Sequence, residues 1–256
     1  MTLIVRPGFQ FDTDASTYIE AVEVADAQAL ETATRYAIND FVIGCKQDGI
    51  WSAIKASCIL SGARTLAGAL IPLAGTAPTN LGPFVSGDYN RKTGLVGNGI
   101  SKALNSNRSR SADPINSFHA SLFLSTAGTS VLFGAATNNQ NDQVLALNAT
   151  QGTFVRGRTV SIDNRVTGFI GASNNVSALT ARASGRNVVN TDSMYSSFAD
   201  SSNYYIFARN ISDGSPTAGS PTGARLAFYS IGESLNLAAL DARVTALITA
   251  FGVAIP

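Results

Sequence analysis

Most of the second half of the chain consists of short segments rich in β-branched and aromatic residues, separated by clusters of turn residues. Residues 138–142 and 213–216 are two of these clusters, and their Asn, Asp, Gly and Pro residues favour tight turns. The segments cover residues 117–125, 129–137, 142–150, 152–162, 165–173, 178–185, 203–210 and 225–232. Many short strands at this spacing favour an antiparallel β-sandwich of the jelly-roll type over a parallel α/β sheet.

Residues 1–70 follow a helical pattern instead. Capping side chains stand at residues 12–14, and apolar residues recur after them at helical spacing. The apolar stripe consists of Leu30, Ile38, Phe41, Val42 and Cys45. We expect Gly49 to end this helix and residues 50–60 to form another. One face of that second helix would carry Trp51, Ile54 and Cys58.

Residues 234–252 have helical spacing too, and we expect Glu233 to be an acidic residue in the first turn of this helix. Their apolar residues are separated by three, four, three and four positions, which is a heptad pattern. These residues are Leu237, Leu240, Val244, Leu247 and Phe251. Two heptads are too few for an independent coiled coil, so two interpretations stay open. The stripe either packs on its own domain or forms an assembly interface in a homo-oligomer.

The fold class predicted from these patterns is mainly β: an antiparallel sandwich with N-terminal helices and a C-terminal helix. We expect an N-terminal strand and helical segment at 1–70 that packs on the sandwich. The sandwich itself would cover 71–235, and the C-terminal helix and tail 236–256.

Charge and hydropathy exclude several classes of partner. The chain has 18 Lys and Arg against 17 Asp and Glu, scattered along its length, so no basic patch indicates nucleic acid. The sequence shows no uncharged apolar stretch of about 18 residues, so we expect no membrane span. The N-terminus has no signal-peptide pattern. We therefore expect synthesis and folding in a cytoplasm. There Cys45 and Cys58 would be buried free thiols.

Catalytic patterns are missing from the sequence. His119 is the only histidine, and it lies within an expected strand with no nucleophile-elbow motif elsewhere. Glutamate is absent between Pro114 and Pro221, so the carboxylate pair of a glycoside hydrolase has no obvious source. We expect no enzyme activity and no cofactor. A calcium ion on loop side chains stays an open question, with Asn141, Asp142, Asp192 and Asp200 as the candidates.

Aromatic residues offer one candidate binding surface. Tyr195, Tyr204 and Tyr205 cluster with Phe198 among polar neighbours, as in an aromatic platform for carbohydrate. The alternative is that these rings pack in half-buried strands.

Four stretches of the sequence resemble a group of phage and prophage virion proteins that have a laminin-G/concanavalin A-like jelly-roll sandwich. They are the helical preamble TYIEAVEVADAQAL…AINDFVIGCKQDGIWSAIKA, the bend KTGLVGNGISKALNSN, the strand INSFHASLFLS, and the closing RLAFYSIGESLNLAALDARVTALITAFG. The segment ARTLAGALIPLAG, after the Trp51 step, is more apolar than this group leads us to expect.

The resemblance implies a non-enzymatic bacteriophage virion protein, and no catalytic residue is carried over from it. A tail fibre or baseplate component that binds host surface glycan is the first expectation. A capsid decoration (cement) protein on the head and a free lectin-like carbohydrate-binding module are the alternatives. The expected partners are other virion proteins and further copies of the chain, as in a trimer, and the expected location is the virion.

Overall fold

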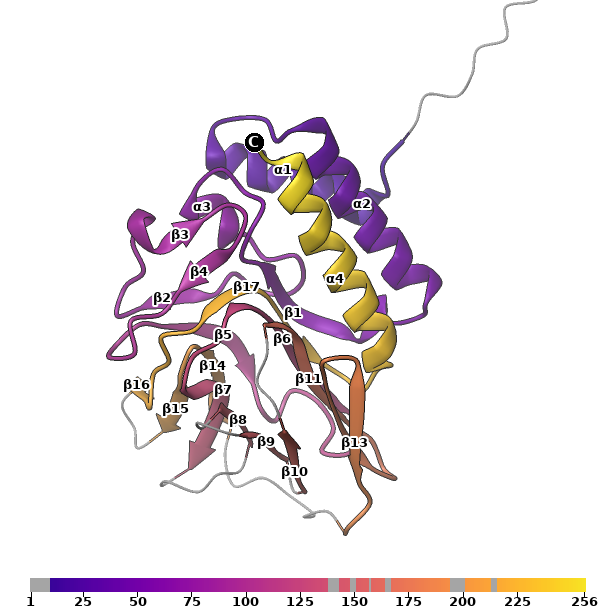
Figure 1. The fold of residues 1–256 in the computed structure, drawn as a ribbon, viewed down its shortest axis with the longest axis vertical. Coiled ribbons are helices and arrows are strands. Elements are labelled where there is room, and N and C mark those ends of the chain that lie inside the picture. Colours follow the sequence, from indigo (N-terminus) through magenta and orange to yellow (C-terminus); the bar gives the residue numbers. More distant parts are fainter. Residues whose placement is uncertain are drawn as a thin grey trace, which may run out of the picture.

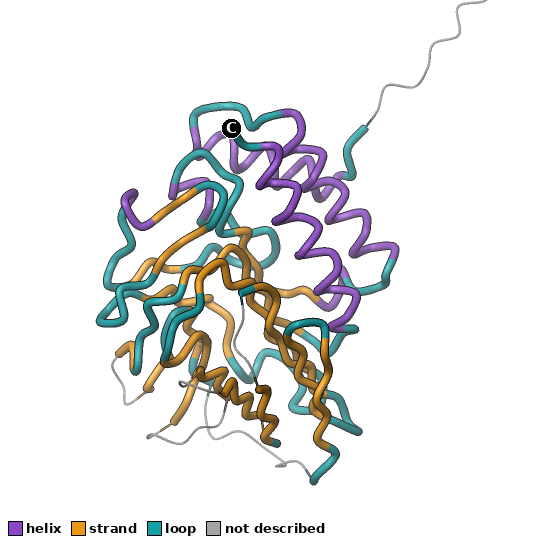
Figure 2. The backbone as a smooth tube through the Cα atoms, viewed as in Figure 1, coloured by secondary structure: helices purple, strands orange, loops and turns teal. Residues whose placement is uncertain are grey.

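The computed structural model describes residues 10–137, 143–147, 151–156, 158–163, 167–193, 201–212 and 216–256. Two largely antiparallel β-sheets pack face to face, and helices cover the outer face of one of them (Figures 1 and 2). The helices are α1 (Thr13–Asp26), α2 (Thr32–Gln47), the short α3 (Leu66–Ala69) and α4 (Leu237–Ala254). The predicted mainly β, jelly-roll-type sandwich with helices at both ends of the chain is confirmed.

The first sheet lies beneath the helices. Its strands, in spatial order, are β13 (Arg186–Asn190), β12 (Leu179–Ala183), β11 (Gly168–Asn174), β6 (Phe118–Thr126), β17 (Arg225–Gly232), β4 (Gly94–Val96) and β3 (Tyr89–Asn90). Strand β1 (Ile54–Ile59) also pairs with β17. A strand of residues 1–70 therefore belongs to this sheet.

The second sheet closes the sandwich from the other side. Its order is β10 (Thr159–Asp163), β9 (Gln151–Arg156), β8 (Gln143–Leu147), β7 (Ser130–Thr137), β14 (Asn203–Ile206), β5 (Ala103–Ser109) and β2 (Thr79–Leu81). Strand β15 (Arg209–Ser212) runs parallel to β7 and pairs with β16 (Pro216–Gly219).

Strand β6 shows why the fold has two cores. Phe118, Ala120, Leu122 and Leu124 alternate along it and enter the core between the sheets. The residues between them face the helices. There Phe123 packs against the second core, which lies between this sheet and the helices. Because one strand supplies both layers, the sandwich and its helical cap form one continuous packed structure.

The helical cap is held by apolar contacts and by capping side chains. The Phe41 ring of α2 packs edge-on against Phe228 of β17, with ring centroids 5.8 Å apart. Asp12 caps α1 by accepting a hydrogen bond from the Asp14 amide, as the sequence predicted. Asn236 caps α4. Among the described residues, α4 alone has the length and mean hydropathy (1.6) of a membrane-crossing helix, yet its heptad stripe is buried in this cap.

Two local predictions were wrong. Residues 50–60 form a 3₁₀ turn and then strand β1, not a helix, because the edge of β17 offers a ladder of backbone hydrogen bonds. A short apolar run is compatible with both helical and strand periodicity, so pairing with a neighbouring strand decides which structure forms. Glu233 is not in the first turn of α4, which begins at Leu237. Its carboxylate pairs with Lys55 at 3.0 Å instead.

Candidate functional site

The predicted aromatic platform is not exposed. Tyr204 and Tyr205 have 0% and 1% of their surface accessible, because β14 is an interior strand between β7 and β5. The Tyr204 ring packs between the sheets, with centroids 4.6 Å from Phe133 and 5.5 Å from Phe118. The prediction that Tyr204 and Tyr205 form a binding surface is therefore wrong, and strand packing is the correct alternative. Tyr195 lies outside the described residues.

The heptad residues of α4 are buried within their own chain. Leu237, Leu240, Val244, Leu247 and Phe251 all belong to the core beneath the helical cap. The interpretation of these side chains as an assembly interface is wrong, because the sheet and α2 already cover them. Packing on the domain itself is confirmed, as is the prediction of two buried free cysteines, Cys45 and Cys58.

His119 is completely buried and links β6 to the chain that leads into α4. Its Nδ1 lies 2.6 Å from the Glu233 carbonyl oxygen, and its Nε2 lies 2.7 Å from Oγ of Ser230. A carbonyl can only accept, so Nδ1 carries the proton and the Ser230 hydroxyl donates to Nε2. Burial lowers the pKa of His119 to about 4. This serine–histidine pair has no contact with solvent, so it holds strands together and reaches no substrate.

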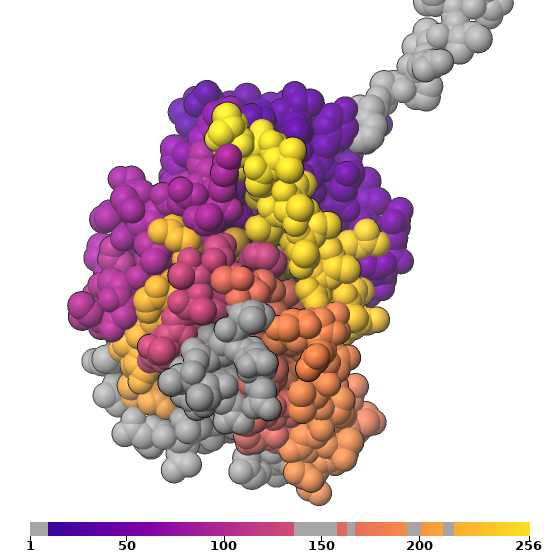
Figure 3. All heavy atoms as spheres, viewed as in Figure 1, coloured from indigo at the N-terminus to yellow at the C-terminus, as the bar shows by residue number. Residues whose placement is uncertain are grey.

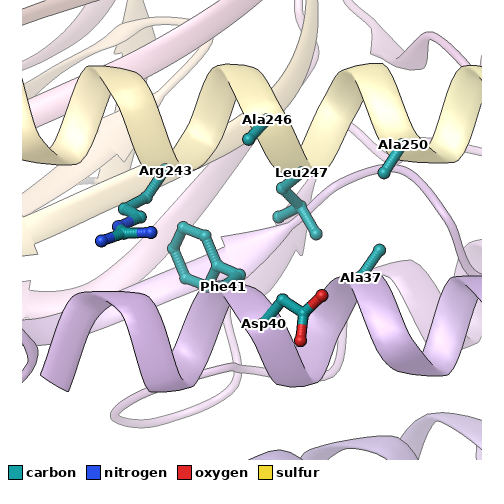
Figure 4. A pocket seen from close by; sticks show the side chains of 7 residues that line it. All are labelled: Ala37, Asp40, Phe41, Arg243, Ala246, Leu247 and Ala250. Atoms are coloured by element: carbon teal, nitrogen blue, oxygen red, sulfur yellow. The ribbon is translucent and has the colours of Figure 1, made fainter. Parts of the chain in front are cut away.

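Within the described ranges, no group of three or more His, Cys, Asp or Glu side chains is arranged to hold a metal ion. Among the described residues, two concave surfaces flank α4. The first is a groove of about 230 Å³ between α2 and α4 (Figure 4). Phe41 and Leu247 point toward each other across it, and alanines widen it. The lining consists of Ala37, Asp40, Phe41, Arg243, Ala246, Leu247 and Ala250.

The groove is mostly apolar, and its one cation is already paired. The guanidinium of Arg243 binds both carboxylate oxygens of Asp48, at 2.8 and 3.0 Å. It also lies over Gly44, where a Cβ would be only 2.7 Å from it. The groove thus offers small side chains and few hydrogen-bonding groups.

The second surface, which we call the rim pocket, lies where the first turn of α4 meets β11, β12 and the hairpin to β13. It has a volume of about 200 Å³. Its lining residues are Ser173, Asn175, Thr180, Asn187, Leu235, Asn236, Leu237 and Ala238. Figure 3 shows the surface of α4 adjoining the orange surface of β12 and β13 at this end of the helix.

Strand register places the polar side chains of the rim pocket on one face. Ser173 of β11 is directly opposite Thr180 of β12, so both project to the helix side of the sheet. Asn187 of β13 is directly opposite Arg182, which lies on the same face of β12 as Thr180. The turn between β12 and β13 places Ser184 and Gly185 at φ 49° and 73°, as a two-residue hairpin requires.

Internal hydrogen bonds occupy the side-chain amide oxygens of the rim pocket and leave side-chain donor groups unpaired. The Oδ1 of Asn175 accepts from the amides of Ser177 and Ala178, and the Oδ1 of Asn187 accepts from Arg182. In the described part of the chain, Nδ2 of Asn175, Nδ2 of Asn187 and the hydroxyl of Thr180 have no hydrogen-bond partner. These groups can therefore bind a polar ligand without losing an internal bond.

Sequence patterns predicted strands at 165–173 and 178–185, which border the rim pocket, but not the pocket itself. The alternation of Thr180 and Arg182 with small apolar residues indicates the polar face of β12. The wall formed by Leu235–Ala238 comes from a segment about fifty positions further along, and no local pattern shows that it returns to this strand.

No family model and no curated protein matches this chain. Among solved structures, it is similar to Trypanosoma rangeli sialidase in complex with sialic acid, with a TM-score of 0.45 and 14% identity. That match covers 77% of this chain and 33% of the sialidase. It is also similar to the Ruminococcus gnavus IT-sialidase CBM40 bound to α2,3-sialyllactose, with a TM-score of 0.38 and 15% identity. Here 57% of this chain and 96% of the module are covered.

A third match, to leech intramolecular trans-sialidase, has a TM-score of 0.36 and 13% identity and covers 54% of this chain. This chain spans about a quarter of the leech enzyme and a third of the trypanosomal one. At these values the likeness assigns neither a ligand nor a reaction to the chain. The class of the protein rests on its own topology: a two-sheet, jelly-roll-type sandwich with a helical cap.

Proposed function

We propose that this protein is a non-enzymatic glycan-binding module and that the rim pocket is its binding site. The observation that carries the proposal is the set of unpartnered neutral groups of Asn175, Thr180 and Asn187 on strands and a turn whose geometry is fixed. Sugar hydroxyls donate and accept hydrogen bonds, so amide and hydroxyl side chains are suitable partners for them.

Size and surroundings support a small polar ligand. A volume of about 200 Å³ is below the about 300–1,000 Å³ typical of sites for drug-sized molecules, and it suits about one sugar ring. Val189 is directly opposite Thr180 on the same face of the sheet and is 55% exposed. It provides an apolar surface for the C–H groups of a ring. The lining contains no carboxylate pair of the kind that glycoside hydrolysis uses, which supports binding over cleavage at this site.

The test is a glycan array followed by calorimetry with the full chain. We expect Asn187→Ala and Thr180→Ala each to weaken binding about fivefold to tenfold, the equivalent of one lost hydrogen bond. Gln47→Ala and Thr32→Ala, exposed positions on α2, are matched controls that should leave affinity unchanged. Absence of binding across the array, or equal loss in the controls, would refute the proposal.

We propose further that the module works on the surface of a phage particle. The support is the sequence resemblance, together with the fact that its first and last pieces meet in one unit through the contact of Phe41 with Phe228. Immunogold electron microscopy of purified particles tests this. Label on the tail supports a fibre or baseplate component, and label on the head a decoration protein. Unlabelled particles would refute a virion role and leave a free lectin-like module.

A further inference from the structure

We infer that the rim pocket selects neutral sugars over acidic ones and that Asp241 sets this selectivity, an inference that rests on the proposed glycan-binding function. Proteins bind carboxylates and other anions mainly through guanidinium groups and through the open N-termini of helices. Both features border the rim pocket: the guanidinium group is that of Arg182, and the helix N-terminus is the first turn of α4. Whether they can bind an anion depends on what already occupies them.

Arg182 is already paired. Its Nε donates to Oδ2 of Asp241 at 2.8 Å, and its Nη1 donates to the Gly185 carbonyl at 3.1 Å and to Asn187 at 3.0 Å. The Asp241 carboxylate is held in place by Thr245, whose hydroxyl donates to Oδ1 at 3.1 Å. Both members of the pair are largely buried, with 15% and 16% of their side chains exposed. The guanidinium that contacts the lining residue Asn187 is thus neutralised before a ligand arrives.

Two amides in the first turn of α4 are occupied as well. The Oδ1 of Asn236 accepts from the amides of Ala238 and Ala239, at 3.0 and 3.2 Å. The amide of Leu235 donates to Oγ of Ser173 at 3.1 Å. An acidic sugar would have to displace the Asn236 side chain to reach these amides, whereas a neutral hydroxyl needs only Asn175, Thr180 or Asn187.

The lining itself carries no charged side chain. The Asp241 carboxylate pairs with Arg182, so an anionic ligand gains no free cation from this pair. Neutral hydrogen bonding is therefore the chemistry that the described residues of the pocket provide, and Asp241 is the residue that makes an otherwise cationic rim neutral.

The test measures the affinity of the full chain for pairs of oligosaccharides that differ only in a terminal sialic acid. We expect wild type to prefer the neutral member of each pair. Asp241→Asn keeps the shape of the side chain, removes its charge and leaves the positive charge of Arg182 uncompensated. We expect this variant to bind the sialylated member about tenfold more tightly, as one charge-assisted hydrogen bond predicts, while its affinity for the neutral member changes less than about twofold.

Two further variants make the result specific. Asp241→Asn combined with Arg182→Gln should lose the gain, because the uncompensated guanidinium is then absent. Asp48→Asn breaks the comparable pair of Asp48 with Arg243 on the flank of α4 and should change neither affinity. If no glycan of either kind binds, the proposed function fails. If wild type prefers sialylated ligands, or if Asp241→Asn leaves the preference unchanged, glycan binding stands and the inference about selectivity is refuted.

Discussion

The two concave surfaces beside α4 have similar volumes but different chemistry. The groove along its flank, about 230 Å³, lies between two helices and is lined mainly by alanines and by the edges of Phe41 and Leu247. The rim pocket at its N-terminal end, about 200 Å³, lies between the helix and strands and is lined mainly by amides and hydroxyls. The groove exists because small side chains leave space between packed helices. The pocket exists because the sheet continues beyond the point where the helix begins.

The difference shows that cavity size alone does not identify a binding site for a polar ligand. Space between helices that is bordered by alanines offers a sugar few hydrogen bonds. Space above a strand can be polar without loss of stability, because alternate residues of that strand face the core. In β12, Leu179 and Ala181 enter the core between the sheets while Thr180 faces the rim pocket.

The largest expected effect removes the support that both surfaces share. Leu240 of α4 is completely buried in the core beneath the helical cap. We expect Leu240→Ala to lower the free energy of unfolding by about 2–5 kcal/mol, through lost burial and a residual cavity. Urea denaturation measures this change. Thr249→Ala, on the exposed side of the same helix, should stay within about 0.5 kcal/mol of wild type, and equal losses in both variants would contradict the packing described.

The second expected effect is a loss of stability at acid pH that begins at the N-terminal end of α4. In the folded protein His119 has a pKa of about 4, below the ordinary 6.5, so the unfolded chain binds a proton in this interval that the folded chain does not. Stability should therefore fall as pH drops from about 6.5 to about 4, by on the order of 3 kcal/mol in total. Urea midpoints between pH 4 and 7.5 for wild type and His119→Gln measure this contribution.

The difference between these two curves isolates His119 from the other titrating groups. Because His119 holds the Glu233 carbonyl just before α4, hydrogen exchange at acid pH should increase first near Leu235 and Leu237, at the rim-pocket end. Parallel curves for the two proteins, or exchange that begins at the groove, would contradict this account.

The smallest expected effect on stability distinguishes the two surfaces directly. Ala246→Leu places an apolar side chain in the groove and should change the free energy of unfolding by less than about 0.5 kcal/mol without changing glycan affinity. Thr180→Leu fills the rim pocket and should abolish binding. Calorimetry and thermal unfolding of both variants check this, and loss of binding in Ala246→Leu would move the binding site to the groove.

Much of the fold could be predicted from the sequence, whereas the candidate site could not. Segments such as 117–125 and 225–232 are rich enough in β-branched and aromatic residues for their composition alone to predict strands. Strands β6 and β17 are found there. Strand β13 was not predicted, because its exposed residues give no alternation until the hairpin at Ser184 and Gly185 pairs it with β12. The rim pocket depends on that pairing and on the return of α4.

Local sequence patterns were enough to predict the local conformations: strands separated by Asn, Gly and Pro turns, a helix capped by Asp12, and a final helix with one apolar stripe. Periodicity and capping act over a few residues, so they can be seen in the chain alone. The faces that those elements bury or expose depend on how the whole chain packs. This packing placed Tyr204 and Tyr205 inside the sandwich, changed residues 54–59 from helix to strand through pairing with β17, and brought Asn236 beside Thr180. Hydrogen-bond partners and burial across such distances depend on strand register and helix docking, which no local pattern encodes.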